Sequence, residues 1–346
     1  MWIVAGLVLV VTVNAVADAE GRGALDEGLV FFGDSLVDVG NTYMATGQAV
    51  PPSPYWAGRF SDGPVWVEHL AEALGQPAPT PAWEGGNNFA FGGSQTADAL
   101  GPVSNFADLD EQVAMYTDRQ DGPGRRSRHD LHVIWSGAND FLLGGQTDPG
   151  VPVDNLATEL QNLYDAGARQ MLVANMPPLG QVPLIRETPA APALDAAAHQ
   201  YNILLEQALQ EIEAEHQDLR LYRMDVAAAV QSVLDQPEAF GFVNTTDPAL
   251  GSVGIFDPQF DPSAASPVPD AEEYLFWDGA HPTAAMHELL ADVAMDSLDG
   301  LLPPGQFSAD PAAAHAQATV PEPASMTTLL LLAGGGELIR RRRSRR

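Results

Sequence analysis

Two common residues, cysteine and lysine, are absent from this sequence. Without thiols the chain cannot form disulfides, a cysteine nucleophile, an Fe–S cluster or a Cys-ligated zinc site. At 346 residues it is long enough to bury a core that holds the fold without disulfides. It also lacks an HExxH motif and an EF-hand loop, so we expect neither a metal nor another cofactor.

Positively charged residues are far fewer than acidic ones. Sixteen arginines stand against 46 acidic residues, which gives a formal net charge of −30. Such a surface repels nucleic acid and anionic lipid headgroups, so we expect no nucleic-acid partner. The charge is typical of a solvated acidic surface suited to salty surroundings; attraction of cationic or metal-bearing substrates is the alternative interpretation.

The first residues are typical of a secretory signal peptide. Residues 2–13 are apolar apart from Thr12, and small residues follow from Ala15 to Ala19. This pattern predicts a signal peptide over residues 1–19, although no Lys or Arg precedes the apolar run. The run is also shorter than the roughly 20 residues that span a membrane. We therefore expect an exported protein.

The last residues carry a second pattern that is typical of protein sorting. Val320-Pro321-Glu322-Pro323-Ala324 precedes a leucine run over residues 329–332 and an arginine-rich tail over residues 340–346. This resembles the PEP-CTERM sorting signal of Gram-negative bacteria, although Gly334–Glu337 interrupt the apolar segment. The resemblance implies transient membrane anchoring through this segment and cleavage by an exosortase, with the secretion machinery as a further partner. The protein would then be periplasmic, at the cell surface or extracellular; a frayed basic tail is the alternative.

Between the two ends, the pattern predicts one globular domain over residues 20–300 and a linker rich in Pro and Ala over residues 301–319. Within the domain, buried strands alternate with amphipathic helices. We expect strands at 29–32, 131–135, 170–174 and 219–224, and helices at 65–74, 153–166, 193–216 and 282–298. The alternation favours an α/β fold with a parallel sheet covered on both faces, whose functional residues gather at the carboxyl ends of the strands. Residues 241–270 lack periodicity and predict a long structureless loop, a binding loop or a lid.

A candidate nucleophile lies at the end of the first strand. Ser35 follows Phe32-Gly33-Asp34, and we expect the N-terminus of a helix directly behind it. A serine nucleophile needs an imidazole base that a carboxylate orients. Asp278 and His281 offer both groups three residues apart, and Pro282 restricts His281 to an extended loop before the last helix.

Donors for an oxyanion are present in two further segments. Asn88–Gly93 ends in two glycines, whose backbone N–H groups a substrate can approach closely. Ser136–Asp140 follows the second predicted strand and presents the Asn139 amide. Each such donor lowers the barrier of acyl transfer by roughly 3–4 kcal/mol.

These segments resemble the conserved blocks of the GDSL, or SGNH, hydrolase family. Residues 32–41 (FGDSLVDVGN) match its nucleophile block, residues 88–93 its glycine block, residues 137–140 (GAND) its asparagine block and residues 278–281 its Asp-x-x-His block. Gly58–Gly63 and Asn175–Gly180 also match the plant-type, lipase-like branch. All of these matches occur in the family's order along the chain.

The resemblance implies a fold, an activity and roles for single residues. The fold would be a flavodoxin-like three-layer α/β/α sandwich with a parallel sheet of about five strands. The activity would be cleavage of lipid or short-to-medium acyl esters through an acyl-serine intermediate. Ser35 would be the nucleophile, His281 the base and Asp278 its orienting partner. The Ser35 and Gly93 N–H groups and the Asn139 side chain would form the oxyanion hole; Gly93 is chosen over Gly92 because it lies five residues after Asn88, as in the family.

Simpler roles exist for the same residues. Ser35 could cap a helix, Asn139 and Asp140 could form a turn, and Asp278 and His281 could be a surface pair. Asp38 and Asn41 are expected to brace the nucleophile turn, and the other histidines to pack in the core or face solvent. Four aromatic residues could line an acyl pocket or pack in the core: Trp56, Trp66, Trp83 and Phe91. At the level of function, the alternatives are a deacetylase of extracellular polysaccharide and a non-catalytic surface or matrix protein.

Overall fold

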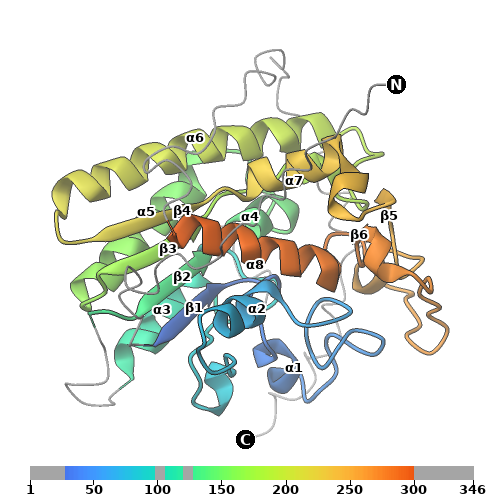
Figure 1. Ribbon diagram of the computed structural model, residues 1–346, viewed down its shortest axis with the longest axis horizontal. Helices are drawn as coiled ribbons and strands as arrows, with labels where there is room; N and C mark the ends of the chain where they lie inside the picture. The colour runs from blue at the N-terminus through green and yellow to red at the C-terminus, as the bar shows by residue number, and fades with distance from the viewer. Residues whose placement is uncertain (1–27, 98–105, 120–127, 300–346) are drawn as a thin grey trace, which may run out of the picture.

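The computed structural model describes residues 28–97, 106–119 and 128–299 (Figure 1). The predicted signal peptide at 1–19, the linker at 301–319 and the sorting signal at 320–346 lie outside the described residues. Within the described ranges, no helix combines the length and the apolar character needed to cross a bilayer.

A parallel sheet forms the centre of the domain. Its strands lie in the order β1 (Leu29–Gly33), β2 (Leu131–Trp135), β3 (Gln170–Ala174) and β4 (Arg220–Met224). Every strand predicted from the sequence is present, and β1 and β2 are buried along their whole length, as expected for their mostly apolar sequences.

The sheet has four strands where about five were expected. The place of a fifth strand, along the outer edge of β1, is taken by residues 87–91. The Phe31 N–H donates to the Asn87 carbonyl at 3.0 Å, and the Phe89 N–H donates to the Phe31 carbonyl at 2.8 Å. Only a single parallel bridge, Phe31 with Asn88, results from this pairing, so the segment covers the edge of the sheet without extending it.

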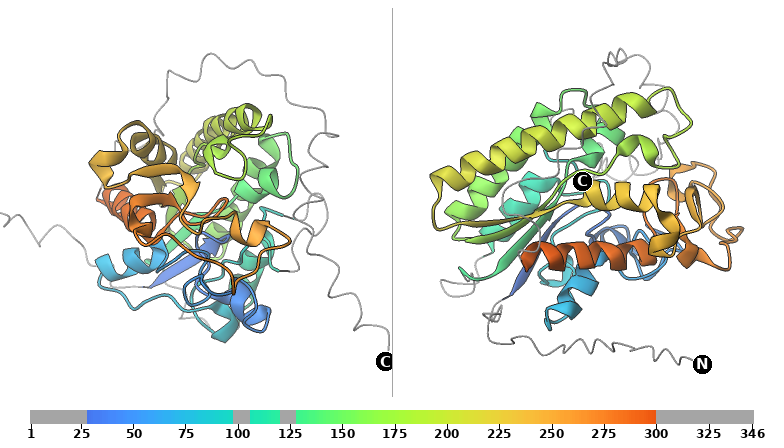
Figure 2. Two further views of the ribbon diagram at one scale, coloured as in Figure 1. Left: turned by 90° about the vertical axis from the view of Figure 1, so that its right-hand side faces the viewer. Right: turned by 45° about the horizontal axis from the view of Figure 1, so that its top comes forward.

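Helices cover both faces of the sheet, which gives the predicted three-layer α/β/α sandwich (Figure 2). On one face α8 (Ala284–Leu298) packs against α2 (Trp66–Ala73) and α7 (Val226–Asp235). On the other face α5 (Gly150–Asp165) packs against α3 (Leu109–Asp118) and α6 (Ala191–Glu215). The long helices lie close to their predicted positions. Local periodicity did not predict α3 and α7, nor the short helices α1 (Asn41–Ala45) and α4 (Ala138–Leu142).

Two apolar clusters stabilise the domain. The larger one joins the sheet to both helical layers, and Trp66 is its largest fully buried side chain. A smaller one, called the second cluster here, is formed by Tyr55, Ala249, Leu250 and Trp277. Its members come from the early loop that follows α1, from residues 249–250 and from position 277, so it joins three parts of the chain that are separate in sequence.

The prediction of a structureless loop over residues 241–270 is wrong in part. Strand β5 (Asn244–Pro248) pairs in parallel with β6 (Tyr274–Phe276), and a 3-10 turn, η4 (Gly254–Phe256), follows. Both strands lie together on the right-hand side of Figure 1. Backbone hydrogen bonds to residues 273–277 hold this region, for example from the Leu250 N–H to the Trp277 carbonyl at 2.8 Å. Such pairing leaves no periodic signal in a polar segment.

We expect Gly33→Ala to destabilise the protein strongly, because Gly33 (φ +151°) ends β1 against a neighbouring backbone. A Cβ there would lie 2.3 Å from the Trp135 carbonyl oxygen and 2.9 Å from Val37. The expected loss in the free energy of unfolding is about 3 kcal/mol or more, measured by urea unfolding. Gly75→Ala is the control, since Gly75 also has a positive φ (+69°) but its Cβ would meet nothing within 4 Å. Equal losses in the two variants would contradict the steric explanation.

Candidate active site

Ser35 lies in a tight turn at the carboxyl end of β1. The N–H groups of Val37 and Asp38 both donate to the Asp34 carbonyl, at 3.1 and 2.9 Å, and close the turn. The helix expected directly behind Ser35 is absent, because α1 begins only at Asn41. The prediction of a helix N-terminus at the nucleophile is therefore wrong, and local turns present the Ser35 hydroxyl instead.

Asp38 and Asn41 brace this turn against the glycine segment. The Asp38 carboxylate accepts hydrogen bonds from the Gly40 and Asn41 N–H groups, both at 2.7 Å, and from the Gly92 N–H at 3.2 Å. The Asn41 amide donates to the carbonyl of Asn88 at 2.8 Å and to that of Ala90 at 2.9 Å. The two predicted blocks therefore form one hydrogen-bonded unit.

Hydrogen bonds to Ser61 and Asp62 hold the loop that carries His281 in place. The Ser61 hydroxyl donates to the Pro282 carbonyl at 2.9 Å, and the Ala284 N–H donates to the Asp62 carboxylate at 2.7 Å. Thr283 caps α8 directly after the loop. Ser61 and Asp62 belong to the Gly58–Gly63 block, for which the sequence predicted no role. In the structure they hold the loop before α8.

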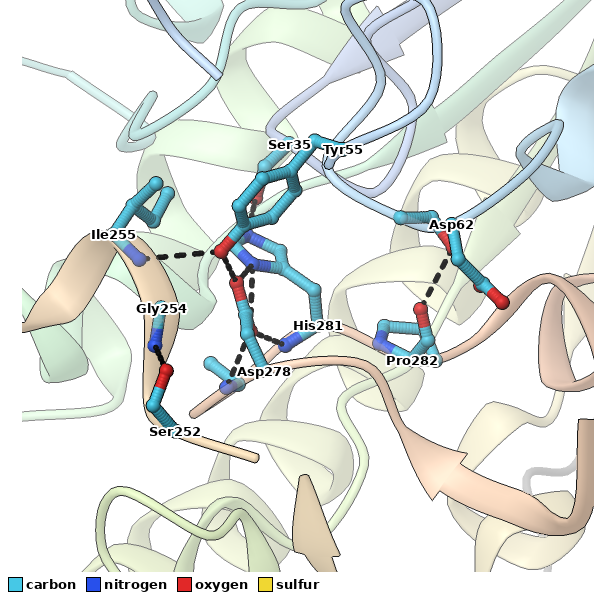
Figure 3. A network of polar contacts seen from close by, with 11 residues as sticks. Ser35, Tyr55, Asp62, Ser252, Gly254, Ile255, Asp278, His281 and Pro282 are labelled. Atoms are coloured by element: carbon cyan, nitrogen blue, oxygen red, sulfur yellow. Dashed lines mark hydrogen bonds and ion pairs between the residues drawn. The ribbon is translucent and has the colours of Figure 1, made fainter. Parts of the chain in front are cut away.

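Ser35, His281 and Asp278 lie in one hydrogen-bonded row (Figure 3). The Ser35 hydroxyl and His281 Nε2 are 2.9 Å apart, and His281 Nδ1 lies 2.8 Å from Asp278 Oδ2 and 3.0 Å from Oδ1. Since a carboxylate only accepts hydrogen bonds, Nδ1 carries the proton and Nε2 accepts from the serine. The three residues are 8 %, 5 % and 0 % exposed, so bulk water has little access to the row.

Two phenylalanine rings flank the imidazole. The ring centroid of Phe60 lies 5.2 Å from that of His281, and the centroid of Phe256 lies 5.4 Å away in a stacked arrangement. Both contacts fix the plane of the ring, and they lower the local dielectric around it.

The predicted oxyanion donors lie on segments that are hydrogen-bonded to the turn that carries Ser35. The Gly92 N–H is already taken, since it donates to Thr42 Oγ1 at 2.7 Å as well as to Asp38. Among the described residues, the N–H groups of Ser35 and Gly93 have no hydrogen-bond partner. The Asn139 amide donates to the Ser94 carbonyl at 2.9 Å and reaches Asp34 at 3.4 Å. The geometry thus favours Gly93 over Gly92 as a donor to substrate.

Tyr55 also belongs to the site, and the sequence reading missed it. Its hydroxyl donates to Asp278 Oδ2 at 2.5 Å across 223 positions of sequence. A single tyrosine in a loop rich in proline carries no motif, so only the folded arrangement reveals this contact.

Two of the remaining histidines and two of the four aromatic residues are buried. Burial lowers the pKa of His132 to about 4 and that of His287 to about 3, so both stay neutral in the core. Of the four aromatics, Trp66 and Phe91 are buried, whereas Trp56 and Trp83 are exposed. In the part of the chain that the structure describes, no cluster of three His or acidic side chains could hold a metal ion.

A serine, an imidazole and a carboxylate bonded in sequence at the carboxyl edge of a parallel sheet define the class of α/β serine hydrolases. The family model "GDSL-like Lipase/Acylhydrolase" matches residues 29–294, more than three quarters of the chain. The protein belongs to this family and is a carboxylic ester hydrolase.

Named relatives agree with this assignment. A phosphatidylcholine-sterol acyltransferase of Aeromonas hydrophila is 29% identical, over 85% of this chain and 95% of its own length. A GDSL esterase/lipase of Arabidopsis thaliana is 28% identical, over 79% and 91% of the two chains. Among solved structures, an acetylxylan esterase of Geobacillus stearothermophilus covers 82% of this chain and is itself covered to 97%, with 15% identity and a TM-score of 0.43.

Asp34 makes a testable contribution to stability. Burial raises its pKa to about 6, against an opposing hydrogen bond from the Leu36 N–H. A carboxyl with a raised pKa binds its proton more tightly in the folded state, so its contribution is full below the unfolded pKa and is lost as the pH rises through about 6. We therefore expect Asp34→Asn to gain stability relative to wild type between about pH 4 and pH 7, by up to roughly 3 kcal/mol.

Urea unfolding of both proteins at the two pH values measures this difference, and a gap that does not change with pH would contradict it. Asp261→Asn supplies a control without pH dependence in this range. The Ser263 hydroxyl and N–H lower the pKa of exposed Asp261 from 3.8, so its stabilising contribution is present at both pH values and is lost only in stronger acid.

Proposed function

We propose that Ser35, His281 and Asp278 hydrolyse lipid or short-to-medium acyl esters through an acyl-serine intermediate. The 2.9 Å contact between the Ser35 hydroxyl and His281 Nε2 is the observation that carries the proposal. As Ser35 Oγ attacks the ester carbonyl carbon, its proton passes to Nε2, and the carbonyl oxygen becomes an oxyanion. Asp278 holds Nδ1 and stabilises the imidazolium that forms.

Collapse of the tetrahedral intermediate breaks the bond to the leaving alcohol, which takes the proton from His281. Water then attacks the acyl-Ser35 ester by the same steps in reverse and releases the carboxylic acid. The Ser35 and Gly93 N–H groups bind the oxyanion together with the Asn139 amide. The substrate oxygen replaces the long 3.4 Å contact between Asn139 and Asp34, while the shorter bond to Ser94 keeps the amide in place.

Ser35→Ala tests the nucleophile directly. The variant should lose at least about a thousandfold in kcat/KM on nitrophenyl butyrate, because within the described residues it is the Ser35 hydroxyl that bonds His281 Nε2. A fluorophosphonate probe should label the wild type stoichiometrically at Ser35 and leave the variant unlabelled. Full activity of the variant would refute the mechanism, and an unlabelled, inactive wild type would favour the non-catalytic surface protein.

Asn139→Ala tests the oxyanion hole. We expect kcat to fall by roughly 10²–10³ with KM little changed, because the amide bonds the charge that develops in the transition state. Steady-state kinetics on the same ester give the split. A rise in KM with unchanged kcat would instead show that Asn139 binds the ground state.

A substrate panel addresses the acyl donor. The name of the Aeromonas hydrophila relative refers to a phospholipid and a sterol, which supports lipid esters as substrates of this chain. Phosphatidylcholine vesicles and nitrophenyl octanoate should therefore be cleaved at least as well as nitrophenyl butyrate. A hundredfold preference for acetylated xylan would overturn the lipid proposal in favour of polysaccharide deacetylation.

Export completes the proposal. The apolar start and the Pro321-Glu322-Pro323 motif support secretion, removal of residues 1–19 and exosortase cleavage near the motif. Intact-mass analysis of protein recovered from the cell surface and medium of a Gram-negative host with an exosortase tests both cleavages. Full-length protein in the cytoplasmic fraction would contradict this part of the proposal alone.

A further inference from the structure

We infer that Tyr55 is a positioning residue of the hydrolytic site: its hydroxyl holds the Asp278 carboxylate in the orientation that keeps His281 turned toward Ser35. The inference deepens the proposed function and rests on it. Tyr55 touches none of the reacting atoms, and its contribution passes through Asp278.

The two oxygens of Asp278 are held in different ways. Oδ1 accepts from the backbone N–H groups of Ala280 at 2.9 Å and His281 at 2.8 Å, which are its own neighbours on the loop. Oδ2, the oxygen nearer to His281 Nδ1, accepts in addition only from the Tyr55 hydroxyl, at 2.5 Å, within the described residues. Tyr55 therefore fixes the oxygen on which the imidazole depends.

Tyr55 is itself held rigidly. Its side chain is 5 % exposed, lies in the second cluster, and meets the Trp277 ring edge-on at a centroid distance of 6.0 Å. The hydroxyl accepts from the Ile255 N–H at 3.2 Å while it donates to Asp278 (Figure 3). Burial and the nearby carboxylate raise the pKa of Tyr55 far above its ordinary value, so it remains a donor at any working pH.

The same hydroxyl links the site to the region around residue 255. Ile255 lies in η4, and its neighbour Phe256 stacks on the His281 ring. Gly254 (φ +60°) lies so close that a Cβ at this position would come within 2.2 Å of the Tyr55 hydroxyl, and it would also lie 2.9 Å from Leu250 and 3.0 Å from the Asp278 Cβ. Residue 254 thus offers a way to displace the hydroxyl while the tyrosine ring stays in the second cluster.

Tyr55→Phe is the first test, on the full chain with nitrophenyl butyrate. We expect kcat to fall about tenfold with KM within about twofold, because one charge-assisted hydrogen bond to Asp278 is lost. The Asp278 charge is then shared with fewer donors and stabilises the protonated imidazole more strongly. The acid limb of the kcat/KM profile should move to higher pH by about half a unit.

Tyr55→Phe leaves the other charged and titratable groups around His281 unchanged. Asp278 lies on its own loop, Asp34 acts on it from the nucleophile turn and neutral His287 from α8. Tyr164→Phe is the matched control. Its hydroxyl also donates to a carboxylate, Asp218 at 2.8 Å, but at the opposite, amino-terminal edge of the sheet, so kcat and the pH profile should not change.

Gly254→Ala is the second test and serves if Tyr55→Phe folds poorly. The added methyl group should lower kcat and move the acid limb as the loss of the hydroxyl does. Where Tyr55→Phe folds, the effect should shrink in that background, which has no hydroxyl to displace. Gly251→Ala is the control for backbone strain, since Gly251 has φ +75° in the same region and its Cβ would meet only the Ser266 carbonyl at 3.6 Å.

The outcomes separate this inference from the proposed function. If Ser35→Ala is inactive while Tyr55→Phe keeps wild-type kcat and acid limb and shows only a lower Tm, Tyr55 merely packs in the second cluster and the inference is overturned. If Ser35→Ala keeps its activity, the proposed function itself is wrong.

Discussion

One hydrogen bond, between the Ser35 hydroxyl and His281 Nε2, spans 246 positions of sequence and sets the main demand on this fold. The carboxyl end of β1 and the loop before α8 must therefore lie next to each other, and their relative position must be accurate to a few tenths of an ångström. The sheet and the packing of α8 on α2 bring them together, and Ser61 and Asp62 then tether the loop through Pro282 and Ala284. The tethers matter because a bond of this length tolerates little drift in either partner.

The shortage of cations shapes how buried carboxylates are stabilised. In the described residues around the site, Asp38 is held by backbone N–H groups, Asp140 by Thr96, and Asp278 by backbone, imidazole and phenol donors. The buried arginine Arg223 pairs instead with acidic residues of α6, away from the reacting groups. Neutral donors stabilise a carboxylate without cancelling its charge, so Asp278 keeps its attraction for the imidazolium that forms during acyl transfer.

The features that could be predicted from the sequence are those whose patterns lie within a short stretch of residues. Buried strands and long amphipathic helices have recognisable local patterns of apolar residues, and all four strands and the three-layer fold were predicted correctly. The pairing of β5 with β6, the helix α3 and the edge role of residues 87–91 depend on long-range partners, so local periodicity could not show them. Ser35, Asp278 and His281 stand in recognisable motifs, whereas Tyr55 reaches Asp278 from a loop without one.

The contacts of η4 bear on how a substrate reaches the buried serine. Phe256 stacks on His281, and the Ile255 N–H donates to the Tyr55 hydroxyl, which in turn donates to Asp278. Outward movement of η4 would therefore strip the imidazole of an aromatic neighbour and Tyr55 of a hydrogen bond at the moment of substrate entry. Entry of a substrate past η4 would therefore disturb the base at the point where it must accept the Ser35 proton, whereas entry past other residues leaves these contacts in place.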